Sequence, residues 1–192
     1  MQKPRYLTKS LFKTSLECET KLYYSKKQEY PDKKIDDPFL EALAEGGFQV
    51  EELARIYHGG GTLVEGRDYK GVLDITNFLL LEEKVIIYQA AFRYENLFIR
   101  ADIIVKDGNK LDLIEVKAKS FDGKDSMNFL NKSGNLDTGW VPYVYDVAFQ
   151  KYVITMAHPQ FQVRSYLLLA DKNAKATVNE LNQKFLIVRD KN

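Results

Sequence analysis

The segment Arg100–Lys119, RADIIVKDGNKLDLIEVKAK, decides the fold of this chain. Two runs rich in β-branched and other apolar residues flank Asp107-Gly108-Asn109, a pattern typical of two strands joined by a tight turn. Another β-rich run comes shortly before them. The three runs, 84–92, 97–106 and 110–119, predict three consecutive antiparallel strands.

Helical spacing of apolar residues occurs on both sides of these strands. Thr8 or Ser10 can cap a first helix, and Asp37-Pro38 is a favourable start for a second. Gly46-Gly47 weakens or splits that second helix, and Gly59–Gly61 ends it. The expected helices cover 8–26, 38–58, 74–82 and 143–157, the other strands lie near Leu63 and over 161–170, and a terminal element covers 178–189.

This order predicts one α/β domain over residues 1–192, with a central sheet flanked by helices. The polar segment 120–140 predicts a long loop or lid. With 192 residues, 45% hydrophobic and 29% charged, the composition is that of a globular domain and excludes disordered and collagen-like chains. No apolar run approaches the roughly 20 residues of a membrane span, and no secretory signal is visible. Together with a single cysteine, Cys18, this favours a cytoplasmic protein without membrane contact.

Charge is distributed unevenly although the net charge is only +1. Residues 1–34 carry nine Lys or Arg against four Asp or Glu, whereas residues 35–58 carry one against six. A basic segment beside an acidic one is expected of a phosphate-binding rim around a metal site. Lysine-rich helices that are simply solvated give the same pattern, and charge alone favours that simpler interpretation.

Asp102, Glu115 and Lys117 are the residues most suggestive of chemistry. Asp102 interrupts an otherwise apolar strand, and Glu115 and Lys117 share one face of the next strand because side chains alternate. In a suitable hairpin register the two carboxylates and the lysine converge, and carboxylate oxygens suit Mg²⁺ or Mn²⁺. A cross-strand ion pair on a surface hairpin is the alternative. Spacing alone leaves both interpretations open.

An Asp, a hairpin and then Glu-x-Lys resemble the core of the PD-(D/E)XK nuclease superfamily. The details are similar to its RecB-like branch, which includes CRISPR-associated exonucleases. That branch has a histidine at the end of a helix upstream of the hairpin, where His58 stands. It also has a glutamine on the helix after the Glu-x-Lys strand, where Gln150 stands.

The resemblance implies a restriction-endonuclease-like core with a mixed sheet, and hydrolysis of DNA phosphodiester bonds with Mg²⁺ or Mn²⁺. The implied metal ligands are His58, Asp102, Glu115 and the carbonyl oxygen of Val116. Lys117 would position the attacking water, and Gln150 would brace the lysine or a phosphate. An exonuclease that acts on single-stranded DNA or on free DNA ends is expected.

Two features differ from similar proteins. Some carry an iron–sulfur cluster, and Cys18 resembles one of its ligands, but no other cysteine is present, so no cluster is expected. Ile154 stands where a tyrosine is common. Similar domains are often joined to others, so residues 1–192 are either a minimal nuclease or the N-terminal part of a longer protein.

A basic groove and exposed tyrosines are the expected contacts to nucleic acid. The candidates are Lys9, Lys13, Lys21, Lys26 and Lys27 for the backbone, and Tyr143 or Tyr145 for stacking on an unpaired base. Gln89, in an apolar strand, is a minor candidate for the metal site. Two other functions stay open: a non-catalytic nucleic-acid-binding or assembly module on the same fold, and an interaction domain that docks a partner through the 120–140 loop.

Overall fold

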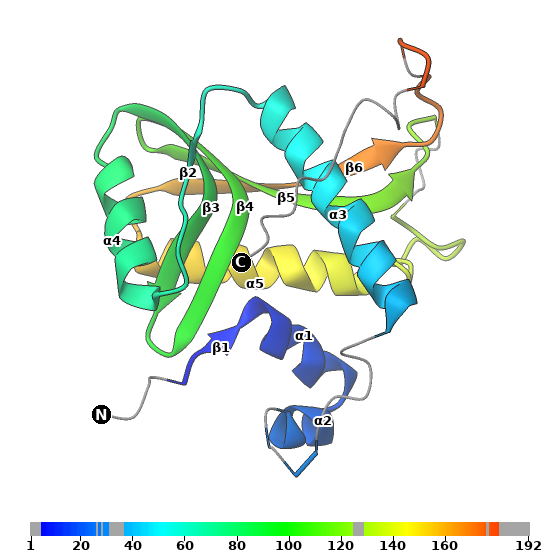
Figure 1. Ribbon diagram of the computed structural model, residues 1–192, viewed down its shortest axis with the longest axis horizontal. Coiled ribbons are helices and arrows are strands. Elements are labelled where there is room, and N and C mark those ends of the chain that lie inside the picture. The colour runs from blue at the N-terminus through cyan, green and yellow to red at the C-terminus, as the bar shows by residue number, and fades with distance from the viewer. Residues whose placement is uncertain are drawn as a thin grey trace.

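The central sheet has six strands with mixed pairing, and helices pack on both of its faces (Figure 1). The computed structural model describes residues 5–25, 27, 29–30, 37–124, 129–175 and 177–180. The strands are β1 Leu7–Thr8, β2 Thr62–Leu63, β3 Lys84–Tyr94, β4 Leu97–Asp107, β5 Lys110–Phe121 and β6 Gln162–Asp171. The helices are α1 Lys9–Glu17, α2 Glu19–Tyr24, α3 Pro38–Tyr57, α4 Tyr69–Leu79 and α5 Val141–Ala157.

The predicted meander is confirmed as β3, β4 and β5. These strands are antiparallel, and the sheet order is β2-β3-β4-β5-β6. The outer strands β2 and β6 pair in parallel with β3 and β5, so the sheet is mixed. The predicted α/β class, with a central sheet between helices, is therefore confirmed.

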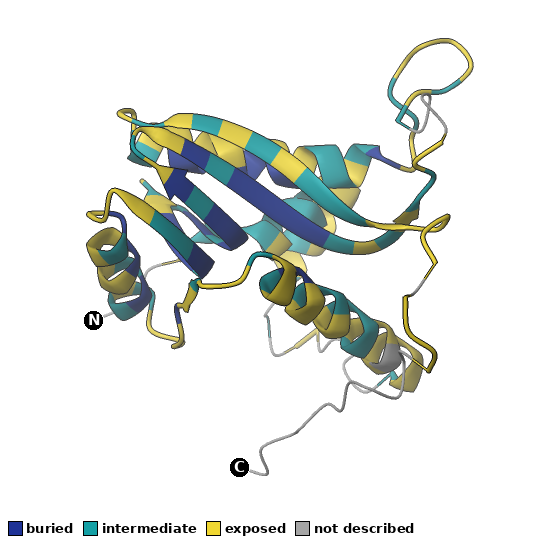
Figure 2. Cartoon of the chain, turned by 90° about the horizontal axis from the view of Figure 1, so that it is seen from above, coloured by how far each residue is buried: buried dark blue, intermediate teal, exposed yellow. Residues whose placement is uncertain are grey.

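Two apolar cores lie on opposite faces of the sheet. Successive residues alternate between them, since Ile104 and Leu113 belong to one core and Ile103 and Ile114 to the other. Residues of α1, α4 and α5 pack against the first core, whereas α3 packs against the second through Ala54. Buried residues gather in the central strands, while the outer side of α3 is exposed (Figure 2).

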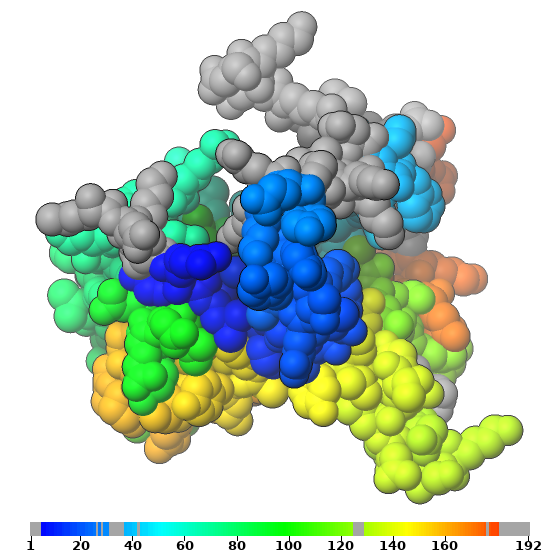
Figure 3. All heavy atoms as spheres, turned by 90° about the horizontal axis from the view of Figure 1, so that it is seen from below, coloured from blue at the N-terminus to red at the C-terminus, as the bar shows by residue number. Residues whose placement is uncertain are grey.

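One edge of β4 is shared by two strands. β5 pairs with residues 103–107 of β4, and β1 pairs with Leu97 and Phe98, which leaves a gap between them. The chain passes directly from β1 into α1 at this gap. Phe12 of α1 stacks on Phe149 of α5 at 4.3 Å, and α1 lies against α5 on the face shown in Figure 3. The first turn of α1 is thereby fixed beside the gap.

Helix boundaries differ in two places from the predicted ones. The first predicted helix is broken at Cys18, which is extended, so that α1 and α2 are separate. α4 begins at Tyr69 instead of residue 74, because the Asp68 side chain accepts the Gly71 N–H and caps the helix. None of the described helices has the length and apolar character needed to cross a membrane.

The remaining predictions are met in part. α3 starts after its Asp37 cap and continues unbroken through Gly46-Gly47. The 120–140 segment is mainly turns after β5 ends, with one isolated bridge between Leu130 and Leu136, and residues 125–128 lie outside the described part. Most of the terminal element predicted over 178–189 also lies outside it.

Tyr88 fixes the end of α3 to the sheet. Its hydroxyl donates to the His58 carbonyl at 2.6 Å and accepts the Gly61 N–H at 3.1 Å. A Cβ on Gly61 would lie 2.4 Å from Cζ of the Tyr88 ring. Glycine is therefore required at this position by close approach.

Gly61→Ala should destabilise the protein by about 1–3 kcal/mol, the usual cost of overpacking a filled site. Gly46→Ala is the matched control, because a Cβ there would have no neighbour within 4 Å and Gly46 lies inside α3. That change should stabilise the protein by up to about 1 kcal/mol. Urea unfolding measures both, and equal effects of the two substitutions would contradict the packing described.

Candidate active site

Asp102 lies where β4 and β5 part. The last pair of the ladder is Ile103 with Ile114, and one step further Asp102 and Glu115 would face each other. There the Asp102 Oδ2 atom accepts a hydrogen bond from the Val116 N–H at 2.8 Å. The aspartate side chain thus takes the place of the backbone carbonyl oxygen that would accept this bond in a regular pair of strands. Asp102 is buried, and this bond fixes its carboxylate beside Glu115.

Glu115 is the centre of a polar cluster and is fully buried. Lys9 Nζ lies 3.0 Å from Oε1 and 3.1 Å from Oε2 of Glu115. Lys117 Nζ also donates to Oε1, and Gln150 Nε2 donates to Oε2 at 2.7 Å. The predicted convergence of Asp102, Glu115 and Lys117 is present in the structure.

Two residues of α5, one helical turn apart, complete the cluster. Gln150 Nε2 donates to both Glu115 and Asp146, at 2.7 and 3.1 Å, and this fixes the orientation of its amide. Asp146 Oδ2 lies 3.1 Å from Lys117 Nζ. The expected bracing by Gln150 is thus directed at two carboxylates. Asp146 was not predicted from the sequence, although an acid four residues before Gln150 on an apolar helix was a usable signal.

Lys9, which was predicted to contact the nucleic-acid backbone, lines a pocket together with Asp102. Its ammonium reaches into the cluster, 3.5 Å from Asp102 Oδ1 and 3.0 Å from Glu115 Oε1. The reason is that β1 delivers the first residue of α1 to the gap in the sheet. Two carboxylates from two strands therefore share one cation, which comes from a third element.

The cluster holds three carboxylates and two ammonium groups, and burial together with their charges sets the pKa values. Burial and the neighbouring Glu115 raise the pKa of Asp102 to about 7, although Lys9 and the Val116 N–H act in the opposite direction. Burial acts against the charge on Glu115, but Lys9 and Lys117 outweigh it and lower its pKa. Burial likewise opposes the charges of Lys9 and Lys117, yet the carboxylates raise both pKa values.

His58 does not join Asp102 and Glu115. It follows α3, and α3 packs on the opposite face of the sheet, where Ala54 contacts the second core. The His58 carbonyl binds Tyr88, and its ring lies against Tyr57. In the described part of the chain, no group of three or more His, Cys, Asp or Glu side chains has the arrangement of a metal site. The assignment of His58 as a metal ligand, which the resemblance implies, stays a prediction.

α3 approaches the site through Glu51 instead. Glu51 pairs with Arg55 and accepts a hydrogen bond from Gln89 Nε2, and its charge contributes to the raised pKa of Asp102. Gln89 lies opposite Asp102 at the one step that is missing from the β3–β4 register, with a φ of +55°. Gln89 therefore lies beside the site, as the sequence suggested, whereas Glu51 was not singled out.

Val116 presents its side chain to the second core and its N–H to Asp102. Its carbonyl oxygen, which the resemblance makes a metal ligand, stays a prediction. The protein's donor set fits a hard divalent ion, since Asp102 and Glu115 supply carboxylate oxygens that already converge on one positive group.

The other predicted nucleic-acid contacts are spread over α1, α2 and α5. Lys13 is half-buried on α1, Lys21 pairs with Glu17 at 2.6 Å, and Lys27 lies 3.6 Å above the Tyr23 ring. Lys26 lies outside the described residues. Tyr143 is half-buried beside Trp140 and Lys119, whereas Tyr145 is exposed.

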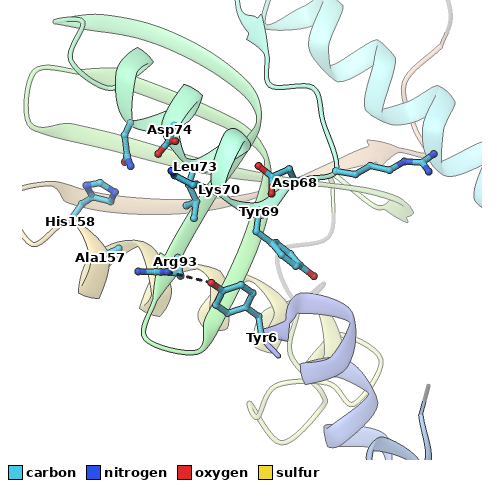
Figure 4. Close-up of a pocket in the computed structure, with 11 residues that line it drawn as sticks. Tyr6, Asp68, Tyr69, Lys70, Leu73, Asp74, Arg93, Ala157 and His158 are labelled. Atoms are coloured by element: carbon cyan, nitrogen blue, oxygen red, sulfur yellow. Dashed lines mark hydrogen bonds between the residues drawn. The ribbon is translucent and has the colours of Figure 1, made fainter. Parts of the chain in front are cut away.

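One pocket adjoins the cluster, and a second lies beside α4. The first, of about 510 Å³, is lined by Asp102, Gln89, Arg100 and the first turn of α1. The second, of about 950 Å³, lies beside α4 and is lined by residues that include Arg67, Lys70, Arg93 and His158 (Figure 4). Tyr69 lines both pockets.

The chain was compared with models of protein families, with curated proteins and with solved structures. None of these matches it.

Asp102→Asn should stabilise the metal-free protein at pH 8. The pKa of Asp102 is raised in the folded protein. Below about pH 4 its carboxyl group is therefore neutral in both the folded and the unfolded state and does not lower the stability. Above about pH 7 it is ionised in both states, and the full cost of burying the charge lowers the stability. Asparagine keeps an acceptor for the Val116 N–H without the charge. The expected gain is of order 1 kcal/mol or more at pH 8, and it should disappear as pH falls to 4.

Chemical denaturation in chelator at the two pH values measures this gain. Asp107→Asn, on the same strand but exposed and paired with Lys84, is the control and should give a small difference that does not depend on pH in this way. A variant Asp102→Asn that is no more stable than the parent at pH 8 would contradict the electrostatic description.

Proposed function

We propose that this protein is a Mg²⁺- or Mn²⁺-dependent nuclease that hydrolyses DNA phosphodiester bonds, on a restriction-endonuclease-like fold of the RecB-like type. One observation carries the proposal: Asp102 and Glu115 converge on a single positive group, the Lys9 ammonium, and Lys117 is bound to Glu115. This is the arrangement expected of Asp…Glu-x-Lys when it serves metal-assisted phosphodiester hydrolysis.

A purely structural role explains the cluster poorly. Buried ion pairs contribute little net stability, because the loss of hydration offsets their attraction. Here Glu115 and Asp146 are almost completely buried, and carboxylates outnumber ammonium groups. The excess negative charge costs stability in the metal-free protein, and a divalent cation would neutralise it. Perturbed carboxylates beside a pocket are typical of functional sites.

Asp102 and Glu115 would hold the metal ion, with the Val116 carbonyl as a further expected ligand. When bound, the ion supplies Lewis-acid activation and neutralises negative charge on the phosphate. The charge of Glu51 adds to the negative potential at Asp102, although the described contacts include none between these two side chains.

Lys117 would orient the attacking water and stabilise the charge that develops on the phosphate. Its ammonium is held by Glu115 and Asp146, so its position is fixed before substrate binds. Gln150 holds the same two carboxylates from α5 and is therefore a positioning residue. Preorganised charge of this kind needs no rearrangement during the reaction.

The larger pocket beside α4 offers contacts for a nucleic-acid strand. Arg67, Lys70 and Arg93 line it together with the acidic Asp68 and Asp74, and the three basic side chains suit phosphate groups (Figure 4). Tyr6 and Tyr69 also line this pocket and pack edge to face with ring centroids 5.0 Å apart, and an aromatic face of this kind can stack on an unpaired base. These features support single-stranded DNA or a free DNA end as the substrate, and hence exonuclease action.

A non-catalytic nucleic-acid-binding or assembly module is the alternative function. Such a module would use the basic pocket, but it would have no need of Lys117 beside two converging carboxylates. Cleavage assays on the parent protein and on Lys117→Ala separate these two functions.

Lys117→Ala should reduce cleavage of labelled linear DNA in millimolar Mn²⁺ by about 10²–10³-fold, the usual effect of removing one such electrostatic group. Lys110→Ala, an exposed lysine on the same strand, is the control and should cleave as the parent does. Closed circular DNA should resist cleavage if the enzyme requires ends.

Parent protein that binds labelled DNA but leaves it intact in Mn²⁺ would support the binding module instead. Cleavage that persists in chelator, or that is unchanged in Lys117→Ala, would overturn the proposed mechanism.

A further inference from the structure

Lys9 occupies the position that a metal ion would need. Its ammonium lies 3.0 and 3.1 Å from the two oxygens of Glu115 and 3.5 Å from Asp102 Oδ1. These are the same oxygen atoms that would bind the divalent ion of the proposed nuclease, on which this inference rests. A lysine ammonium and a metal ion cannot share one position, so the side chain of Lys9 must turn away when the ion binds.

The backbone of Lys9 is held on both sides. Thr8 pairs with Phe98 and caps α1 by accepting the Leu11 N–H, and Phe12 stacks on Phe149. The side chain, in contrast, is a flexible stem of four carbons. A displaced ammonium therefore stays within reach of the site and turns toward the pocket that Lys9 and Asp102 line together.

The charges of the cluster agree with such a movement. With Asp102, Glu115 and Asp146 ionised and Lys9 and Lys117 protonated, the metal-free cluster carries one excess negative charge. A divalent ion would leave one excess positive charge, and a phosphodiester would neutralise it. A cation beside the metal therefore favours the arrival of one anionic phosphate.

We propose that Lys9 is a substrate-binding residue: its ammonium holds the metal position in the metal-free protein and binds a non-bridging oxygen of the scissile phosphate once a divalent ion takes that position. Lys9 stays protonated throughout and transfers no proton. It thus links metal binding to substrate binding, and the two basic side chains Lys9 and Lys117 act on one phosphate from two elements.

The alternative is that Lys9 only stabilises the buried carboxylates. In that case its removal would lower the melting temperature of the metal-free protein, Mn²⁺ would restore it, and the loaded enzyme would turn over normally. The two roles differ in what they predict for cleavage at saturating Mn²⁺.

Isothermal titration calorimetry should show that Lys9→Met binds Mn²⁺ at least about tenfold more tightly than the parent. In the parent, an ammonium that occupies the metal position about nine-tenths of the time or more would lower the apparent Mn²⁺ affinity about tenfold or more. At saturating Mn²⁺ the same variant should cleave single-stranded DNA about 10²-fold more slowly, with a raised KM. Lys151→Met, an exposed lysine next to Gln150 on α5, should match the parent in both measurements.

Lys9→Gln gives the same two expectations and keeps the inference testable if Lys9→Met does not fold, since an amide can donate to both carboxylates. Unchanged Mn²⁺ affinity, or parental cleavage by the folded variant at saturating Mn²⁺, would overturn the role of Lys9 while leaving the nuclease intact. A parent protein that neither binds Mn²⁺ nor cleaves DNA would instead overturn the proposed function, and this inference with it.

Discussion

The hydrogen bond from the Val116 N–H to the Asp102 carboxylate is the interaction on which the site depends. β4 and β5 part at this point, and a buried N–H left without an acceptor would cost free energy. The aspartate supplies the acceptor from its side chain. In doing so it becomes fixed beside Glu115. In the described sheet, Asp102 lies in the stretch of this β4 edge that pairs with neither β1 nor β5.

The helices on the two faces of the sheet contribute differently to the site. α1 and α5 bring Lys9, Asp146 and Gln150 to the face on which Glu115 lies. Lys9 and Gln150 bind the Glu115 carboxylate there, and Asp146 adds a further carboxylate, which pairs with Lys117. α3, which His58 follows, covers the other face, and the charge of its Glu51 acts on Asp102. The carboxylates are thus held by groups from the strands and from α5, whereas one of the two cations comes from the long side chain of Lys9.

Much of this could be predicted from the sequence because the signals are local. Alternation along a strand placed Glu115 and Lys117 on one face, and the tight turn at Asp107-Gly108-Asn109 brought Asp102 back beside them. The inferences on Asp102, Glu115 and Lys117 need only the geometry of one hairpin in the right register. Gln150, in contrast, was assigned only through the resemblance to RecB-like nucleases.

The remaining features depend on tertiary packing. Lys9 belongs to the cluster because two residues of β1 pair with β4, and a strand of that length leaves no periodic signal. His58 ends its helix as predicted, but only the choice of face by α3 decides whether its ring meets the carboxylates. Asp146 depends on which side of α5 contacts the sheet, because apolar residues surround that helix on several sides.

We propose that Asp102 and Glu115 bind the divalent ion and that His58, which follows α3 on the other face of the sheet, does not. Thermal unfolding with and without millimolar Mn²⁺ tests this most directly, because a ligand that binds only the folded state raises its melting temperature. The parent and His58→Ala should both gain several degrees with Mn²⁺, whereas Asp102→Asn should gain almost nothing. No gain in the parent, or a gain that survives in Asp102→Asn and is lost in His58→Ala, would contradict the account.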